Sequence, residues 1–246
     1  MISGYSRSHF WPAAAAIVFL LAVAACNNLP GRPGPGPEVI RPEAVVDFTT
    51  LYKQNCSGCH GAEGRGGAAI ALRDPVYLAI ADDETIRRIT AKGVRGTQMP
   101  PFAQSEGGTL TETQINVIVR GIRSWAKPDT LQHVNLPPYA AGSPGDPRRG
   151  ADVFATFCSS CHGPKGEGTK KASSIVNRTY LALVSNQGLR TIVIAGRPEL
   201  GAPDWRNNMP GRPMSAQEIS DVVAWLAAQR SQFPGQPYPN PEGLKR

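Results

Sequence analysis

Two short motifs with paired cysteines and a histidine are the residues of this 246-residue chain best suited to chemistry. They read Cys56-Ser57-Gly58-Cys59-His60 and Cys158-Ser159-Ser160-Cys161-His162. Cysteines at this spacing can form thioethers to the two vinyl groups of one porphyrin, while the adjacent histidine binds the iron from the proximal side. Cys-x-x-Cys-His is the attachment motif of c-type haem. The sequence therefore predicts two haem c groups, one covalently bound at each motif.

The same cysteine spacing also occurs in redox disulfides and in zinc sites, so both alternatives need weighing. A histidine directly after the second cysteine argues against either. Each motif is also followed, further along the chain, by a methionine and a proline, Met99-Pro100 and Met209-Pro210. The duplication of the whole pattern favours haem, with His60 and His162 as the proximal iron ligands.

The two motifs lie in halves of the chain that match well beyond the cysteines. Turn glycines follow both motifs, and apolar and capping positions correspond at a nearly constant offset. The matched pairs include Gly64 and Gly166, Leu72 and Ile175, Asp74 and Asn177, Tyr77 and Tyr180, Ile86 and Leu189, and Gly93 and Gly196. The halves are therefore interpreted as duplicates of one ancestral domain.

Each half ends in a pattern typical of an amphipathic helix, with apolar residues at i, i+3, i+4 and i+7. These residues are Ile115, Ile118, Val119 and Ile122 in the first half, and Ile219, Val222, Val223 and Leu226 in the second. Thr111 with Gln114, and Ser215 with Glu218, have the spacing of capping boxes. A short helical pattern leads into each cysteine motif, and little resembles an alternating strand. The predicted fold is all-α, twice over.

With these motifs, each half resembles a class I cytochrome c domain, over residues 44–127 and 149–231. The resemblance implies an N-terminal helix, the haem motif, a methionine-bearing loop and a terminal helix that crosses the first. It also implies a sixth iron ligand from the sulfur of a Met-Pro loop, which favours the reduced iron.

The first half follows the family pattern for this sixth ligand. Met99 lies 39 residues after His60, just before the terminal helix, and two prolines follow it. We therefore expect His60 and Met99 to bind the first iron. The alternative is that Met99 only fills the core, as methionine often does.

The second half departs from the pattern, because Ala202 stands where alignment expects the methionine, 40 residues after His162. Alanine cannot bind iron. Met209, seven residues further on, is the expected replacement, whereas Met214 aligns with an apolar helix-entry position and is less favoured. A vacant or weakly held sixth position is the remaining alternative, and His133 of the linker is expected to be solvated.

The fifth cysteine, Cys26, ends an apolar stretch at the N-terminus. Residues 1–25 have the features of a secretory signal, and Val23-Ala24-Ala25-Cys26 resembles a bacterial lipobox, in which cleavage precedes a lipidated cysteine. The prediction is a lipoprotein on the periplasmic side of a bacterial membrane, with acyl chains holding it there. The alternative is an ordinary signal with a chance cysteine.

Proline-rich passages separate the predicted parts of the chain. They are the tether at 26–43, which also contains many glycines, the linker at 128–148 and the tail at 232–246. Together with the signal peptide, these passages bracket two cytochrome domains of modest size. A buried haem in each supplies apolar mass that so short a chain lacks.

The charge of the chain bears on its partners. The formal net charge is +7, which four haem propionates would largely offset, so we expect modest steering toward acidic proteins and no nucleic-acid binding. The basic residues around the second motif are as consistent with a solvated face as with a docking patch. They are Arg148, Arg149, Lys165, Lys170 and Lys171.

The sequence favours an electron carrier over an enzyme. It has no Ser-His-Asp candidate, no phosphate-binding loop and no second metal motif, and haem itself carries the redox chemistry. The leading hypothesis is a membrane-tethered dihaem cytochrome c that passes single electrons from a quinol-oxidising complex or dehydrogenase to a terminal oxidase or other acceptor. The alternatives are a peroxidase-like dihaem enzyme with an open second haem, and a cytochrome subunit of a larger oxidoreductase complex.

Overall fold

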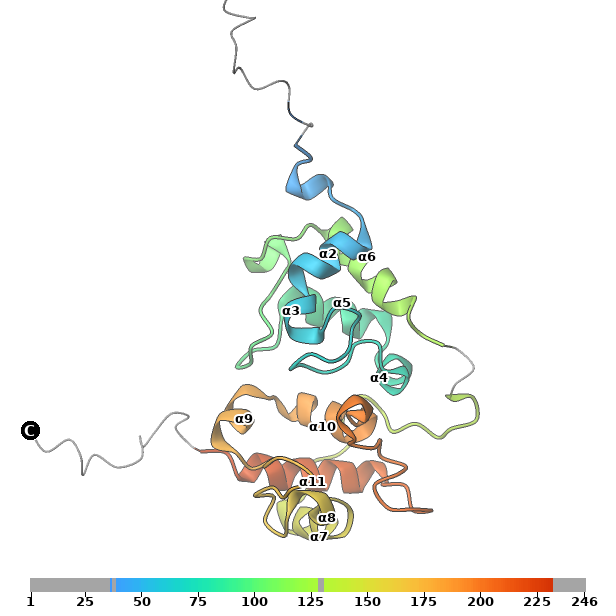
Figure 1. Ribbon diagram of the computed structural model, residues 1–246, viewed down its shortest axis with the longest axis vertical. Helices are drawn as coiled ribbons and strands as arrows, with labels where there is room; N and C mark the ends of the chain where they lie inside the picture. Colours follow the sequence, from blue (N-terminus) through green and yellow to red (C-terminus); the bar gives the residue numbers. More distant parts are fainter. Residues whose placement is uncertain (1–35, 37–38, 128–130, 232–246) are drawn as a thin grey trace, which may run out of the picture. The chain divides into compact units, whose positions relative to one another are not determined.

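The computed structural model describes residues 36, 39–127 and 131–231 (Figure 1). Regular secondary structure in these residues is helical, which confirms the predicted all-α fold. None of their helices combines the length and apolar character needed to cross a membrane. The predicted signal peptide, Cys26, most of the tether and the tail lie outside the described residues.

The helices from α2 to α11 belong to one compact unit that begins at Glu43 and contains two similar lobes. The first lobe, residues 43–127, contains α2 (Phe48–Asn55), α3 (Ser57–His60), α4 (Pro75–Ile80), α5 (Asp83–Lys92) and α6 (Glu112–Arg123), with short 3-10 helices η2 (Pro42–Ala44) at its start and η3 (Gln104–Glu106) before α6. The second lobe, residues 146–231, contains α7 (Pro147–Phe157), α8 (Ser159–His162), α9 (Arg178–Leu183), α10 (Asn186–Ala195), the 3-10 helix η5 (Pro198–Leu200) and α11 (Ala216–Ala228). The same order of helices occurs in both lobes.

The terminal helix of each lobe begins with the predicted capping box. In α6, the Thr111 side chain accepts from the backbone N–H of Gln114, whose own side chain accepts from the backbone N–H of Thr111. Ser215 and Glu218 make the same reciprocal pair in α11. Each box gives partners to backbone N–H groups that a helix start leaves unpaired, and an N-cap contributes about 1 kcal/mol.

Where the first and last helices of each lobe cross, a large residue packs against a glycine. The helix that carries the glycine differs between the two lobes. In the first lobe, a Cβ on Gly121 of α6 would lie 2.0 Å from the ring of Phe48 in α2. In the second lobe the glycine is on the first helix, where a Cβ on Gly150 would lie 2.1 Å from the Asp221 carbonyl oxygen and 2.7 Å from Cβ of Trp225. Close approach of the helices thus requires one glycine per lobe.

An arginine near the end of each lobe ties the terminal helix to the turn between the two middle helices. Each guanidinium donates to two backbone carbonyls and one side-chain oxygen in that turn. The acceptors are Leu78, Ala81 and Asp83 for Arg123, and Leu181, Val184 and Asn186 for Arg230. The three acceptor positions correspond between the lobes, although the arginine comes about one helical turn later in the second lobe.

The described part of the linker is held against the second lobe by a buried arginine. The Arg190 guanidinium donates to Pro138 O at 2.9 Å, to Tyr139 O at 3.1 Å and to Ser220 Oγ at 3.1 Å. Gln187 adds a bond to Tyr139 O at 2.8 Å. Burial lowers the pKa of Arg190, but the three acceptors compensate its loss of water. The linker therefore packs on α10 and α11.

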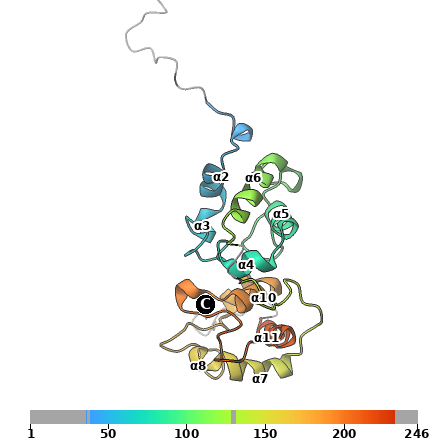
Figure 2. The ribbon, with the colours of Figure 1, turned by 90° about the vertical axis from the view of Figure 1, so that its right-hand side faces the viewer.

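The two lobes meet where α4 of the first packs beside α10 of the second (Figure 2). Buried residues of both lobes belong to one continuous apolar cluster, which includes Val76 of α4 and Ile194 of α10. This contact joins the two lobes, each of which carries one Cys-x-x-Cys-His motif. It also positions the loops described below.

Candidate haem sites

The first Cys-x-x-Cys-His motif forms a single helical turn directly after α2. Cys56 is buried, Cys59 is exposed and His60 is only 8% exposed. The Nδ1 atom of His60 lies 2.8 Å from the backbone oxygen of Ile70. Because a carbonyl oxygen can only accept, Nδ1 carries the hydrogen and Nε2 keeps a lone pair suited to iron.

The second motif repeats this arrangement in α8. Nδ1 of His162 lies 2.8 Å from the backbone oxygen of Ser173, so the same nitrogen again donates and Nε2 again keeps its lone pair. Here Cys158 is partly buried and Cys161 is exposed. His162 is less buried than His60, which makes the proximal side of the second motif the more accessible of the two.

The four motif cysteines fit thioether attachment to haem. No disulfide joins any of these four cysteines. Burial, together with the neighbouring motif cysteine, raises the pKa of Cys56 and of Cys158 to about 12, so neither is predisposed to become a thiolate. A thioether carries no charge, and it therefore suits these apolar positions better than a metal-bound thiolate does.

The segment Gly67-Ala68-Ala69-Ile70 packs against the first motif. The backbone N–H of Ala69 donates to Cys59 O at 2.9 Å, and a Cβ on Gly67 would lie 2.1 Å from the same oxygen. The segment thus orients His60 by direct contact with its motif. Burial lowers the pKa of His60, and the positive charge of Arg197 in the second lobe lowers it further.

The loops that carry Met99 and Ala202 have equivalent backbones. Gly93 and Gly196 end α5 and α10 at positive φ, and a Cβ on either would lie 2.6–2.7 Å from the backbone oxygen of Met99 or Ala202. The residue after each glycine donates its N–H to that same oxygen at 2.9 Å. The structure therefore places Ala202 at the position that Met99 occupies in the first lobe.

The remaining methionines of the second lobe lie further along this loop. Met214 is 3% exposed, and its N–H donates to Trp205 O, just as the N–H of buried Leu110 donates to Phe102 O. Met214 therefore occupies the apolar core position that the alignment predicted. Met209 is partly buried and packs against the core. Its role as iron ligand stays a prediction.

Comparison with known families decides what these lobes are. Residues 43–120 match the family model of cytochrome c oxidase, cbb3-type, subunit III, and residues 147–229 match the family model of cytochrome c. The chain is a tandem dihaem cytochrome c. Its two haem c groups are bound covalently, one in each class I cytochrome c lobe.

Relatives of this dihaem cytochrome include oxidase subunits. It is 30% identical over 137 residues to the cbb3-type cytochrome c oxidase subunit FixP of Sinorhizobium medicae, a match that covers 52% of this chain and 42% of that protein. It is also 30% identical over 129 residues to subunit CcoP of Cereibacter sphaeroides, covering 49% and 40%. The dihaem cytochrome thus spans about two fifths of the length of these curated relatives.

A solved structure is similar over one part of the chain. The KustC0563 c-type cytochrome is 28% identical, with a TM-score of 0.29, and the match covers 33% of this chain and 99% of that one.

The ligand loops of this dihaem cytochrome differ in charge as well as in the methionine. From residue 94 to 103 the first loop has Arg95 as its one charged residue. At the corresponding positions the second loop has two ion pairs, Arg197 with Glu199 at 2.5 Å and Arg206 with Asp204 at 2.5 Å. The second loop is therefore strongly polar where the first is not.

These charges act across the contact between the lobes. Burial raises the pKa of Asp74, at the start of α4, and the negative charges of Asp204 and Glu199 raise it further, against the hydrogen bond from the Tyr77 N–H. The carboxylates of the second lobe's loop therefore lie close enough to influence a buried acid of the first lobe.

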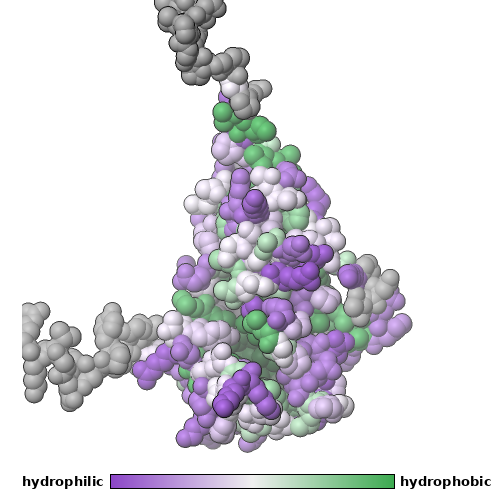
Figure 3. Space-filling model, in the orientation of Figure 1, coloured by the Kyte–Doolittle hydropathy of each residue, from purple (hydrophilic) through white to green (hydrophobic). Residues whose placement is uncertain are grey.

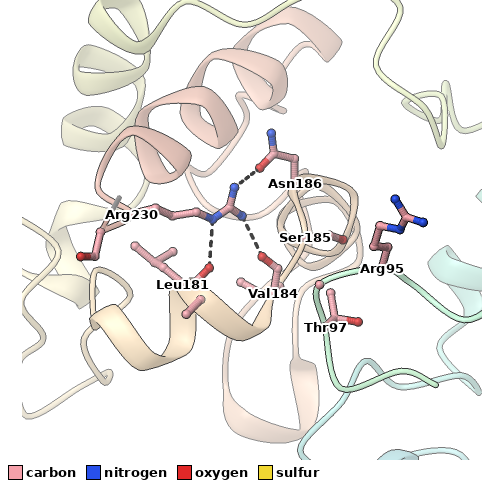
Figure 4. Close-up of a pocket in the computed structure, with 10 residues that line it drawn as sticks. Arg95, Thr97, Leu181, Val184, Ser185, Asn186 and Arg230 are labelled. Atoms are coloured by element: carbon pink, nitrogen blue, oxygen red, sulfur yellow. Dashed lines mark hydrogen bonds between the residues drawn. The ribbon is translucent and has the colours of Figure 1, made fainter. Parts of the chain in front are cut away.

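Other polar features lie outside the haem motifs. His133 of the linker is exposed, as predicted for a solvated residue. A surface pocket of about 350 Å³ lies between Arg95 and Thr97 of the first lobe and the α9–α10 turn (Figure 4). The Arg230 guanidinium at its wall bonds to two backbone oxygens and to Asn186. None of the predicted haem ligands lines this pocket.

Sequence reasoning missed Arg197 and Arg190, both of which join distant segments. Arg197 bonds to residues about 130 positions away, and Arg190 bonds to the linker about 50 positions away. One signal was present for Arg197, because the first-lobe equivalent of this partly buried arginine is Val94. A charge at an apolar position of a repeat indicates a contact that the other copy does not make.

Proposed function

We propose that this dihaem cytochrome transfers single electrons between redox proteins on the outer side of a bacterial membrane. The observation that carries the proposal is the pair of haem motifs, each with its histidine Nδ1 bonded to a backbone oxygen. Haem iron supplies one-electron chemistry when bound. The protein supplies ligands, burial and orientation.

At the first haem, His60 is the proposed proximal ligand and Met99 the proposed distal one. The bond from His60 Nδ1 to Ile70 O fixes the ring plane and increases the basicity of Nε2. Burial of His60 keeps water away from the proximal side. A thioether ligand in a dry site favours the reduced state, so the first haem is the proposed high-potential centre.

At the second haem, His162 is the proposed proximal ligand and the distal ligand is the open question. Met209 is the proposed replacement, because it lies in the same loop as Ala202 and Met214 is committed to the core. If Met209 does not bind, the sixth position is vacant. A vacant position would allow the peroxidase-like alternative, which the alanine at position 202 favours.

Near-infrared charge-transfer bands of methionine-bound ferric haem test these ligands. Met99→Ala should remove the first haem's band, and Met209→Ala should remove the second haem's band. Met214→Ala is the matched control and should leave both bands in place. If Met99→Ala retains the first haem's band, the proposed first site is wrong. Peroxide turnover by the wild-type protein would contradict the role of simple carrier.

The partners we propose follow from the relatives. Because FixP and CcoP are named as subunits of a cbb3-type cytochrome c oxidase, a terminal oxidase is the proposed acceptor, with a quinol-oxidising complex or a dehydrogenase as donor. The chain would act either as a free carrier or as a subunit of such a complex. Co-purification from solubilised membranes distinguishes the two, because only a subunit stays with the oxidase at high salt.

The membrane attachment we propose is a lipid anchor. Its support is the sequence Val23-Ala24-Ala25-Cys26, which resembles a lipobox at the end of an apolar signal. Two or more acyl chains on Cys26 would hold the protein at the periplasmic side of the membrane. Mass spectrometry of the exported protein tests this, since an unmodified N-terminus at or after Cys26 would contradict it.

A further inference from the structure

Arg197 of the second lobe reaches the segment that supports the first haem motif. Its Nη2 donates to Gly67 O at 2.7 Å, and its Nη1 lies 3.5 Å from Ala68 O. The side chain is only 13% exposed, so the bond to Gly67 O is partly shielded from water. A charged donor to a backbone carbonyl in such a site is stronger than an ordinary hydrogen bond.

The segment that Arg197 contacts is bound directly to the proximal histidine's motif. Gly67 has no room for a side chain, because a Cβ would lie 2.7 Å from the carbonyl carbon of His60. Three residues later, Ile70 O accepts from His60 Nδ1. Residues 67–70 therefore connect the Arg197 guanidinium to the His60 ring through four residues of backbone.

Glu199 partly neutralises the positive charge of Arg197 next to this segment. Nε of Arg197 donates to Glu199 Oε1 at 2.5 Å, and the Glu199 side chain is 22% exposed. The Nη2 atom of Arg197 thus contacts Gly67, while its Nε atom contacts Glu199. Partial burial of both side chains reduces screening by water, so each charge should affect the first lobe measurably.

We propose that Arg197 is a positioning residue through which the second lobe holds the proximal segment of the first haem and raises that haem's reduction potential. The second lobe's ligand loop, which lacks the expected methionine, would thus serve the haem of the other lobe. The inference rests on the proposed ligation of the first haem by His60.

The test is a spectroelectrochemical titration of the complete dihaem protein with opposite charge changes. Arg197→Gln removes a positive charge, so it should lower the first haem's equilibrium constant for reduction by roughly three- to tenfold, where tenfold equals ~59 mV. Glu199→Gln removes the compensating negative charge and should shift the same potential upward. A purely structural role for the pair would not give shifts of opposite sign.

Arg65→Gln is the matched control. Arg65 lies two residues before the segment 67–70, but its side chain is 63% exposed and paired with an exposed Glu63. Water should screen its charge, so its removal should shift the potential less than Arg197→Gln does. Arg197→Lys keeps the charge and should recover at least half of the lost shift.

Two results would overturn the inference: a shift in Arg197→Gln no larger than that in Arg65→Gln, or a downward shift in Glu199→Gln. If Arg197→Gln does not fold, the sign of the Glu199→Gln shift decides alone. The wild-type spectrum separates this inference from the proposed function. A wild-type protein without the Met99 band contradicts the proposed ligation, whereas an intact band with unshifted variants contradicts only the role of Arg197.

Discussion

The two lobes of this dihaem cytochrome share their helices and caps but solve one packing problem, the crossing of the first and last helices, in opposite ways. At the helix crossing, the first lobe places the large residue on its first helix and the glycine on its last, and the second lobe reverses them. What the fold requires is therefore one large and one small residue at the crossing, not a particular residue on a particular helix.

The lobes also differ in the residues of their ligand loops. The first loop carries Met99 and a single charged residue, Arg95, whereas the second has Ala202 at the same backbone position and four charged residues around it. These charges lie at the contact with the first lobe. One copy of the loop thus carries a methionine at this position, whereas the other carries an alanine and contributes charged residues to the contact between the lobes.

The face of the molecule seen in Figure 3 shows little further distinction between the lobes. Hydrophilic and hydrophobic residues are interspersed over the visible face of the described part (Figure 3). Leu200, in the short helix η5 of the second lobe's ligand loop, is 71% exposed, and the loop of the first lobe has a threonine there. The main difference between the loops therefore remains the pattern of charge.

The largest predicted effect concerns the helix crossing. Gly121→Ala and Gly150→Ala should each lower the free energy of unfolding by ~1–3 kcal/mol, because the added Cβ overlaps a neighbouring atom. Gly58→Ala is the control, since a Cβ there meets nothing within 4 Å. Chemical denaturation followed by circular dichroism measures all three.

An exchange of residues tests the comparison itself. The double variant Phe48→Gly/Gly121→Trp gives the first lobe the pair that the second lobe uses. We expect it to be more stable than Gly121→Trp alone, since the small residue makes room for the large one. If the double variant is the less stable of the two, the lobes do not use equivalent crossings.

A smaller effect distinguishes the lobes by pH. Asp221 is buried in the second lobe, and the hydrogen bond from Arg149 lowers its pKa to about 2 from an ordinary 3.8, against the effect of burial. The corresponding residue of the first lobe is Val117. Because the folded pKa is depressed, this carboxylate's stabilisation is present above about pH 4 and is lost as the pH falls through 2.

Thermal unfolding of wild type and Asp221→Asn between pH 7 and pH 2 measures this effect. The variant should be less stable at pH 7, and its stability should change less than that of wild type from about pH 4 to 2. Equal pH dependence in the two proteins would mean that Asp221 does not contribute to the acid sensitivity of the second lobe.

The sequence predicted the elements whose signals are local. The i, i+3, i+4, i+7 pattern located the terminal helices, and both capping boxes form as their spacing indicated. The duplicated motifs also located the cysteines and histidines, and the alignment placed Ala202 opposite Met99 correctly. Each of these inferences used residues close together in one half or matched between the halves.

The features that the sequence did not predict depend on contacts between distant residues. The bond from Arg197 to Gly67 spans 130 positions, and no periodicity or motif encodes it. The arginines that tie the terminal helices, Arg123 and Arg230, do not align, because they approach the same acceptors from different turns of the helix. A geometric equivalence of this kind becomes visible only when the chain is folded.

Ala202 occupies the backbone position of Met99, the proposed iron ligand of the first lobe, so introducing a methionine there tests this equivalence most directly. In a Met209→Ala background, adding Ala202→Met should increase the near-infrared methionine–iron band from one equivalent per protein to two, at unchanged haem content. A band that stays at one equivalent, with both haems bound, would contradict the equivalence of Ala202 and Met99.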